Sequence, residues 1–353
     1  MNLQKQKTGL FVGLILGALF GVGGLIFISP PIGGSSSSTI TTAGSTTVYP
    51  LSQDWATRFH AQFPNLVVNP GTGGSGFGQS MIAQGLIDIG ASSAYPNDEY
   101  INDNPSVEIL PISADAIGIV ANDGVNGSVF NMDCDMVVAV FQRNVTTWQE
   151  FSTTFNVPIS ANGPISVFVR SDASGTTATF AKWLETADET DNENNANYDW
   201  RLGHEEAISF PAGANAVDGN QGVSAGVQSN PLSIGYVGLA FMENLTKVNL
   251  YNPGNDQWIA PSISNAINAI PENITTPGQN LMNSGIPGAY PVARLLFYLV
   301  NKDFLRWEPI TYITWCMIQG QKYVEHVGYV PISGTSAQDY TLRILGELEP
   351  PNG

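Results

Sequence analysis

Arg170-Ser171-Asp172-Ala173-Ser174-Gly175-Thr176 joins an apolar run of strand type to a segment of helical spacing. The strand is expected over residues 165–169 and the helix from residue 177. The first turn of a helix leaves backbone N–H groups unpaired and carries the positive end of the helix dipole, and small residues there let a ligand approach closely. This strand, turn and helix therefore predict an anion-binding turn in an α/β protein.

Two other segments have the same character. Ala43-Gly44-Ser45-Thr46-Thr47 precedes a helical pattern over residues 51–63, and Gly73-Gly74-Ser75-Gly76 precedes another over residues 79–84. Each is rich in glycine and hydroxyl side chains, which suit both the start of a helix and hydrogen bonding to an anion. Three such turns directed at one point predict a cradle for a single tetrahedral oxyanion.

Strand-type and helical segments alternate along the chain. This order predicts an α/β fold with parallel sheets and helices on both faces, and with ligands beyond the carboxyl ends of the strands, where the glycine-rich turns fall. The predicted strands are residues 66–68, 87–90, 116–120, 165–169 and 234–237. The predicted helices are residues 51–63, 79–84, 132–142, 177–186 and 309–319.

The composition is that of a loop-rich globular protein. Only 12% of the 353 residues are charged, 43% are hydrophobic, and glycine occurs 37 times. The length suffices for two ordinary domains or for one two-lobed unit. A net charge of −17 argues against nucleic acid or an anionic membrane surface as a partner. It also opposes long-range attraction of an anion, so an anion site must act through local donors.

Residues 1–38 predict a membrane segment followed by a serine-rich linker. Residues 10–28 are all apolar or glycine, Lys5 and Lys7 precede them, and Pro30 follows. The run has the length of one membrane span, and the preceding lysines place the remainder of the chain on the extracytoplasmic side. No Ala-x-Ala cleavage pattern follows, which favours an uncleaved anchor over a cleaved signal peptide, and both remain open.

Two further features bear on an external location. Four asparagines head glycosylation sequons, and whether they are used stays open because such triplets also arise by chance. The sequons begin at Asn126, Asn144, Asn244 and Asn273. The two cysteines, Cys134 and Cys316, lie in apolar segments of helical appearance, which favours two buried thiols over a disulfide.

The glycine-rich segments, taken in order, resemble those of the periplasmic-type phosphate-binding proteins of Pst ABC transporters. The resemblance runs from residue 41 to residue 332, nearly the whole chain after the linker. No single motif identifies the family, but the order and spacing of the motifs together are specific to it. They are Ala43-Gly44-Ser45-Thr46-Thr47-Val48-Tyr49-Pro50, Gly74-Ser75-Gly76, Asp88-Ile89-Gly90-Ala91-Ser92-Ser93-Ala94, Arg170-Ser171-Asp172-Ala173-Ser174-Gly175-Thr176-Thr177, Gly219-Asn220-Gln221-Gly222-Val223, Ile234-Gly235-Tyr236-Val237, Tyr290-Pro291-Val292 and Gly328-Tyr329-Val330-Pro331.

The resemblance implies a two-lobed α/β periplasmic-binding-protein fold of type II, whose lobes are joined by hinge strands and close around the ligand. The first lobe would comprise residues 39–114 and 289–353, and the second residues 115–288. The crossings would fall near residues 113–117 and 288–291, where in each case a loop joins an apolar strand-like run. The implied function is extracytoplasmic capture of inorganic phosphate for the permease subunits of an ABC importer, by a monomer without cofactor or metal.

The resemblance also implies roles for individual residues. Arg170 matches a single buried guanidinium that can donate two parallel hydrogen bonds to an oxyanion, and Asp172 matches an acid that holds this arginine in place. The remaining matches are hydroxyl and backbone N–H donors at the three helix starts. They are Thr46, Thr47, Ser75, Gly76, Ser174, Gly175 and Thr176.

Ser93 matches a ligand contact but departs from the family pattern. In well-known members this position is an aspartate, which accepts the proton of hydrogen phosphate and rejects fully deprotonated sulfate. A serine hydroxyl both donates and accepts, so discrimination against sulfate is expected to weaken. Another tetrahedral oxyanion such as sulfate therefore stays open as the ligand, with Asp115 and Asp172 as candidate substitute acceptors.

An enzyme is the alternative class, and the residues argue against it. His60, His204 and His326 all lie outside the glycine-rich turns. The turns lack a Gly-x-Ser-x-Gly elbow, no Walker lysine motif occurs, and no spacing of histidine, aspartate and cysteine suggests a metal site. A phosphatase would need an activated nucleophile or metal ions. A binding protein is therefore preferred to an enzyme or to an adhesive surface protein.

Overall fold

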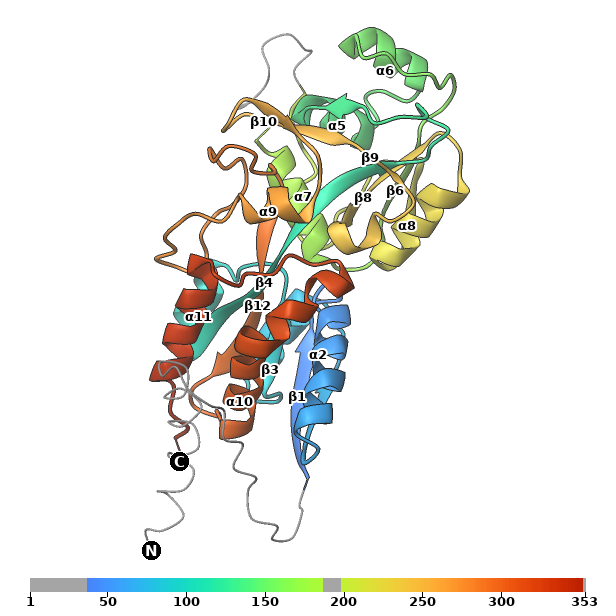
Figure 1. The fold of residues 1–353 in the computed structure, drawn as a ribbon. Helices are drawn as coiled ribbons and strands as arrows, with labels where there is room; N and C mark the ends of the chain where they lie inside the picture. The colour runs from blue at the N-terminus through green and yellow to red at the C-terminus, as the bar shows by residue number, and fades with distance from the viewer. Residues whose placement is uncertain (1–36, 187–197, 352–353) are drawn as a thin grey trace, which may run out of the picture.

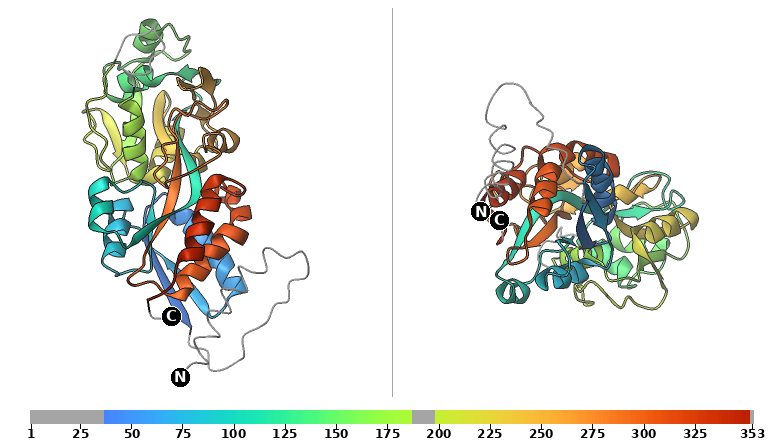
Figure 2. Two further views of the ribbon diagram at one scale, coloured as in Figure 1. Left: turned by 90° about the vertical axis from the view of Figure 1, so that its left-hand side faces the viewer. Right: turned by 90° about the horizontal axis from the view of Figure 1, so that it is seen from below.

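The computed structural model describes residues 37–186 and 198–351, which form two lobes (Figure 1). The lobes lie end to end, and the strands β4 (Val107–Ala121) and β12 (Ala293–Asn301) pass between them (Figure 2). The predicted two-lobed α/β architecture is thus confirmed. The predicted membrane segment at residues 10–28 lies outside the described residues. Within the described ranges, every helix is too short or too polar to cross a bilayer.

The strands form one large mixed sheet and one small sheet. The large sheet has the order β2-β1-β3-β12-β4-β8-β6-β7, with β9 beside β4, and the small sheet has the order β11-β10-β5. The other strands are β1 Ser38–Gly44, β2 Leu66–Pro70, β3 Ile89–Ser92, β5 Asn131–Met132, β6 Ser166–Arg170, β7 Ala214–Val217, β8 Ser233–Gly238, β9 Thr246–Lys247, β10 Asn249–Asn252 and β11 Gln257–Ile259.

The strand β4 carries the large sheet from the first lobe into the second. Up to Ala116 it pairs with β12 of the first lobe, and from Ile117 onward it pairs with β8 of the second. The strand β12 begins opposite this change of partner, because Ala293 pairs with Ala116. The two lobes are therefore connected through neighbouring, antiparallel strands.

Helices pack against the sheet in both lobes. In α2, the spacing of Leu51, Trp55 and Phe59 places three buried side chains on one face. Phe59 packs against Trp315 of α10, with ring centroids 5.5 Å apart. The α-helices are α2 Tyr49–Gln62, α3 Ser75–Ala83, α4 Asp98–Asp103, α5 Cys134–Phe141, α6 Trp148–Phe155, α7 Gly175–Leu184, α8 Gly219–Ser229, α9 Ile263–Ile267, α10 Trp307–Trp315 and α11 Ser336–Glu347. The shorter helical segments are η2 Leu239–Phe241, η3 Cys316–Gly320, η4 Gln321–Tyr323 and η5 Glu325–Val327.

The prediction of parallel sheets is wrong for β12 and for the pairing of β4 with β8. Among residues 37–186 and 198–351, the parallel pairs are β1 with β2 and β3, β6 with β7 and β8, and β5 with β10, whereas β12 runs antiparallel to both neighbours. The sequence pattern also missed β1, because the strand Ser38–Gly44 is rich in threonine and has few apolar residues. The strand β4 is much longer than the predicted 116–120, since the connection between lobes is itself a strand.

The core of the second lobe holds the third glycine-rich turn in place. Phe180 of α7 stacks on Tyr236 of β8, with ring centroids 4.2 Å apart and an interplanar angle of 13°. Both side chains are fully buried, so the helix is fixed directly against the sheet.

Cys134 and Cys316 are buried and free, which confirms the prediction of two separate thiols.

Candidate anion-binding site

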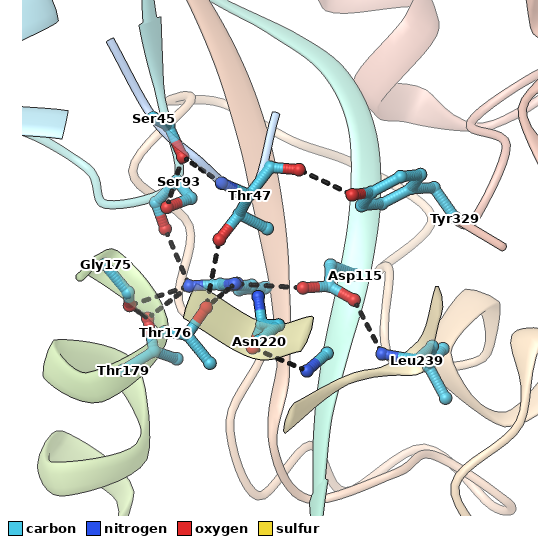
Figure 3. A network of polar contacts seen from close by, with 12 residues as sticks. Ser45, Thr47, Ser93, Asp115, Gly175, Thr176, Thr179, Asn220, Leu239 and Tyr329 are labelled. Atoms are coloured by element: carbon cyan, nitrogen blue, oxygen red, sulfur yellow. Dashed lines mark hydrogen bonds and ion pairs between the residues drawn. The ribbon is translucent and has the colours of Figure 1, made fainter. Parts of the chain in front are cut away.

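The three predicted turns meet where the two lobes touch. The first precedes α2, the second begins α3, and the third begins α7. Figure 3 shows Ser45, Thr47 and Ser93 of the first lobe facing Gly175 and Thr176 of the second. All five residues are buried. Local sequence patterns far apart in the chain therefore converge on one site.

Serine hydroxyl groups connect the first-lobe side of the site. Ser45 Oγ donates to Ser93 Oγ at 2.9 Å, and Ser75 Oγ lies 3.3 Å from Ser93 Oγ. The backbone N–H of Ser93 donates to Ser75 Oγ at 3.1 Å. Ser93 and Ser75, which the sequence assigned to the site from different segments, are thus direct neighbours.

Two side-chain contacts cross from one lobe to the other within the predicted set. Thr47 Oγ1 lies 3.0 Å from Thr176 Oγ1, and Arg170 Nη2 donates to Thr46 Oγ1 at 3.3 Å. Thr46 is half-buried, whereas Thr47 and Thr176 are almost fully enclosed. The hydroxyl groups of the first turn therefore face the guanidinium and helix start of the second lobe.

Arg170 is held in the site by Asp172. Its Nε donates to Asp172 Oδ1 at 2.7 Å, and its Nη2 forms an ion pair with Asp172 Oδ2. The guanidinium is fully buried, and its Nη1 has no hydrogen-bond partner among the described residues. A buried, charged N–H group that lacks a partner is costly unless a ligand accepts from it. Arg170 thus uses Nε and Nη2 to contact Asp172 and Thr46, and its Nη1 is available to donate to a ligand.

The surroundings of Asp172 lower the pKa of its carboxyl group. Burial, the largest single influence, would raise this pKa, but the hydrogen bonds and charge of Arg170 and the backbone N–H of Gly219 together outweigh it. The Gly219 N–H donates at 3.0 Å and lies at the start of α8. Asp172 is therefore held as an ion that orients Arg170.

Ser174 is the N-cap of α7 rather than a free donor. Its Oγ accepts from the backbone N–H of Thr176 at 3.1 Å and from that of Thr177 at 3.3 Å. The hydroxyl of Thr177 pairs with Tyr236 at 2.7 Å, and burial is the main cause that raises the pKa of Tyr236 to about 12. The start of α7 is thereby fixed from both sides, with Gly175 at its tip.

Gly76 is placed differently from the other predicted contacts. It is exposed, whereas its neighbour Ser75 is fully buried at the start of α3. A β-carbon at Gly76 would lie 3.8 Å from the carboxylate of Glu206, a residue of the second lobe. The structure therefore brings Ser75 into the cluster and leaves Gly76 at its margin.

A second buried arginine, Arg294 of β12, lies in the site, and the sequence interpretation missed it. Its Nη2 forms an ion pair with Asp115 Oδ2 at 2.9 Å, and its Nη1 donates to the carbonyl oxygens of Gly175 and Ser93. Burial lowers the pKa of Arg294, and Asp115 opposes this effect. The available signal was a single arginine within the apolar run 292–300 and a single aspartate within 109–121.

Both candidate substitutes for the missing aspartate at position 93 are engaged elsewhere. Asp115 accepts from Arg294 and from the backbone N–H of Leu239 at 3.3 Å, and Asp172 accepts from Arg170. Among the described residues, the hydroxyl and N–H groups of Ser93 pair with Ser45 and Ser75 rather than with either carboxylate. The polar side chain at this position of the site is therefore a serine surrounded by other serines.

The site contains hydrogen-bond donors but lacks a visible catalytic pair. His60, His204 and His326 do not contribute to it, and His204 instead pairs with Glu185 on the surface. Across residues 37–186 and 198–351, no group of three potential metal ligands occurs. Hydroxyls, helix starts and one guanidinium edge favour binding of an anion rather than chemistry on it.

Comparison with known proteins gives consistent matches over most of the chain. The PBP superfamily domain matches residues 29–315. The phosphate-binding protein PstS of Xylella fastidiosa strain Temecula1 is 27% identical over 310 residues, which are 83% of this chain and 81% of the relative. The phosphate-binding protein PstS of Methanocaldococcus jannaschii is 26% identical over 327 residues, 82% of each chain.

The fold is also similar to that of solved structures. A crystal structure of an ABC-type phosphate transport receptor from Vibrio cholerae superimposes with a TM-score of 0.59 at 18% identity, covering 83% of this chain and all of the other. At 18% identity the structural similarity supports the fold alone. The superfamily match is what supports membership of the family. Because that match spans well over half of its residues, the chain belongs to the PBP superfamily.

Proposed function

We propose that this chain is an extracytoplasmic binding protein that captures inorganic phosphate for the permease subunits of an ABC importer. The observation that carries the proposal is the buried Nη1 of Arg170, which lacks a partner among the described residues, on a guanidinium whose Nη2 contacts Thr46 of the first turn. The names of the relatives as phosphate-binding proteins and as a phosphate transport receptor support the same ligand. The matched superfamily is one of binding proteins rather than enzymes.

In this proposal the ligand lies between the lobes and loses its water to protein donors. Arg170 supplies the charged N–H groups, and Asp172 holds the guanidinium in orientation. Hydroxyl and backbone N–H groups of both lobes complete the shell. The proposed contacts are Thr46, Thr47, Ser75, Ser93, Ser174, Gly175 and Thr176, with Gly76 at the margin.

Capture and release follow from movement of the lobes about β4 and β12. The proposed first lobe comprises residues 39–114 and 289–353, and the second residues 115–288. Closure brings Thr47 to Thr176 and Arg170 to Thr46, as in the contacts described above. The closed form then docks on the permease. Residues 10–28 are proposed to tether the protein to the cell membrane, or to direct its secretion if they are cleaved.

A second candidate ligand is sulfate, and Ser93 favours it. Hydrogen phosphate carries a proton that needs an acceptor, whereas sulfate at neutral pH only accepts. The hydroxyl of Ser93 can donate to either anion, and the two nearby carboxylates are engaged by arginines. A site of this kind discriminates less strongly than one with a carboxylate at position 93.

Isothermal titration of the full chain with phosphate, and separately with sulfate, tests the proposal. Titrations between about pH 5 and 9 vary the protonation of phosphate and leave sulfate unchanged. Phosphate binding that exceeds sulfate binding supports the phosphate receptor. Equal binding of both anions assigns a broader oxyanion receptor, and absence of binding of either anion overturns the site.

A further inference from the structure

Arg294 lies at the crossing between the two lobes. It is paired in register with Asp115, so that β12 and β4 each place one charged residue at the same level of the sheet. The side chain of Arg294 is 6% exposed and that of Asp115 is fully buried. Asp115 also accepts from the backbone N–H of Leu239 at 3.3 Å. The carboxylate therefore fixes the orientation of the guanidinium.

A single nitrogen of this guanidinium bridges the lobes. Nη1 donates to the carbonyl oxygen of Ser93 in the first lobe at 3.2 Å and to that of Gly175 in the second at 2.7 Å. Since both bonds share one donor atom, the two carbonyl oxygens cannot separate beyond the sum of these lengths while both bonds persist. Any movement that draws Ser93 away from Gly175 must break one of them.

The other contacts of Arg294 reach α7. Nη2 donates to Thr176 Oγ1 at 3.0 Å in addition to its ion pair with Asp115, and Nη1 also lies 3.2 Å from Thr179 Oγ1. Figure 3 shows Ser93, Asp115, Gly175, Thr176 and Thr179 converging from strands and helix onto this one point. Four of the five N–H groups of a guanidinium belong to its two Nη atoms, and these have protein acceptors here.

We propose that Arg294 is a positioning residue, a latch that holds the lobes together around the ligand site. Both Nη atoms of Arg294 are engaged by protein acceptors, and its Nε lacks a partner among the described residues, whereas in Arg170 the atom without a partner is Nη1. Through its two Nη atoms Arg294 therefore acts on Ser93, Gly175 and Thr176. The identity of the ligand rests on the proposed function, whereas the bridging contacts do not.

The latch contributes to closure with or without ligand, since its acceptors belong to the protein. It therefore raises the fraction of ligand-free molecules in the binding-competent closed form. The apparent dissociation constant equals the intrinsic constant divided by that fraction, so removal of the latch should weaken binding without touching the ligand. It should also enlarge the ligand-free protein.

The test compares wild type with the double variant Arg294→Met/Asp115→Asn, which removes both charges and leaves no unpaired ion in the core. The radius of gyration is measured by small-angle X-ray scattering without ligand and at saturating phosphate, and phosphate affinity by titration calorimetry. We expect a larger ligand-free radius, a dissociation constant raised about tenfold, and a loaded radius equal to that of wild type. Arg294→Lys keeps the charge beside Asp115 but loses the fork, and should shift both readouts in the same direction.

The matched control is Arg306→Met/Asp88→Asn. This pair, 2.8 Å apart, lies within the first lobe and does not bridge to the second. Removal of this pair should leave both the radius of gyration and the phosphate affinity unchanged. Wild-type values of radius and affinity in the Arg294 variants would overturn the latch and make Arg294 a structural ion pair only. Failure of wild type to bind phosphate would overturn the proposed function, while the ligand-free radii would still decide on the latch.

Discussion

Gly175 lies directly against Ser93 across the two lobes, because a β-carbon on Gly175 would stand 2.3 Å from Ser93 Oγ and 3.1 Å from Ser75 Oγ. An alanine at this position is therefore expected to hold the lobes apart. Overpacking of this kind costs about 1–3 kcal/mol, so Gly175→Ala should weaken phosphate binding roughly 5–150-fold. Titration calorimetry measures the loss.

Gly346→Ala is the control for this substitution. Gly346 lies in α11, and a β-carbon there meets nothing within 4 Å. Alanine is favoured over glycine in a helix by about 1 kcal/mol, so the control should be slightly more stable and should bind as wild type does. Unchanged binding by Gly175→Ala would mean that the lobes do not close on Gly175.

Arg170→Lys should weaken binding because it removes the planar fork and keeps the charge. Nε and Nη2 of Arg170 hold Asp172, so that Nη1 remains as the group without a partner among the described residues. A lysine ammonium cannot satisfy Asp172 and a ligand with the same geometry. Loss of one charge-assisted hydrogen bond costs about 1.5–3 kcal/mol, or roughly 10–150-fold in affinity.

The control for Arg170→Lys is Arg201→Lys in the same lobe. The side chain of Arg201 is 76% exposed and pairs with Asp199 at the surface. Exposed pairs contribute little, so both affinity and stability should stay at wild-type values. Equal affinity of Arg170→Lys and wild type would place Arg170 outside the ligand shell.

Much of the site could be predicted from local sequence patterns. A strand, a turn of small polar residues and a helix start are encoded within a dozen neighbouring residues, so the sequence assigns Arg170, Ser174 and Thr176 to the candidate site directly. Their convergence with Thr47 and Ser75 was expected from the shared character of the three turns, and the resemblance supplied the matching positions, because separate turns carry no information about their distance in space. The side of the turn on which Gly76 lies depends on how α3 packs, which the sequence pattern does not define.

The pair of Arg294 and Asp115 could not be predicted in this way. The two residues are 179 positions apart and meet only because β12 and β4 pair antiparallel with one particular register. The sequence indicates that each charge interrupts an apolar run, which predicts a buried polar partner but does not identify it. The prediction of parallel sheets was wrong for β12 and for β4 with β8 for the same reason, since strand order and direction are set by contacts distant in sequence.

Ser93→Asp should increase selectivity for phosphate over sulfate. The introduced carboxylate would face the hydroxyls of Ser45 and Ser75 and the start of α7, where hydrogen phosphate could donate its proton to it. Sulfate has no such proton and would meet an unpaired negative charge, so its binding should fall by several kcal/mol. Competition titrations with both anions measure the ratio of affinities.

Ser80→Asp is the control for the selectivity change. Ser80 is exposed on α3, so an aspartate there adds the same charge as Ser93→Asp but outside the site. It should leave the ratio of phosphate to sulfate affinity at the wild-type value. A ratio that moves equally in both variants would attribute the effect to net charge rather than to position 93.

Asp172 should make the folded protein sensitive to acid. Burial raises the pKa of its carboxyl group, but the hydrogen bonds and charge of Arg170 and the N–H of Gly219 outweigh burial, and the net pKa in the folded state is lowered. A group with a depressed folded pKa contributes stability above its unfolded pKa, about 3.9 for aspartate, and loses that contribution as the pH falls through the folded value. The free energy of unfolding should therefore decline below about pH 4 and be insensitive to this group at neutral pH.

Asp172→Asn should remove this component of the acid sensitivity. At pH 7 the variant leaves Arg170 without its counter-ion, which should lower the free energy of unfolding by about 2 kcal/mol, the scale of a charge-assisted hydrogen bond. Urea denaturation from about pH 2 to 7 should show the difference between wild type and variant shrinking toward acid pH. Asp54→Asn, which breaks an i,i+4 pair with Arg58 on the surface of α2, should cost only about 0.3–0.5 kcal/mol at neutral pH. A wild-type minus Asp172→Asn difference that stays constant across this range would show that the ion pair with Arg170 does not depress the pKa of Asp172 in solution.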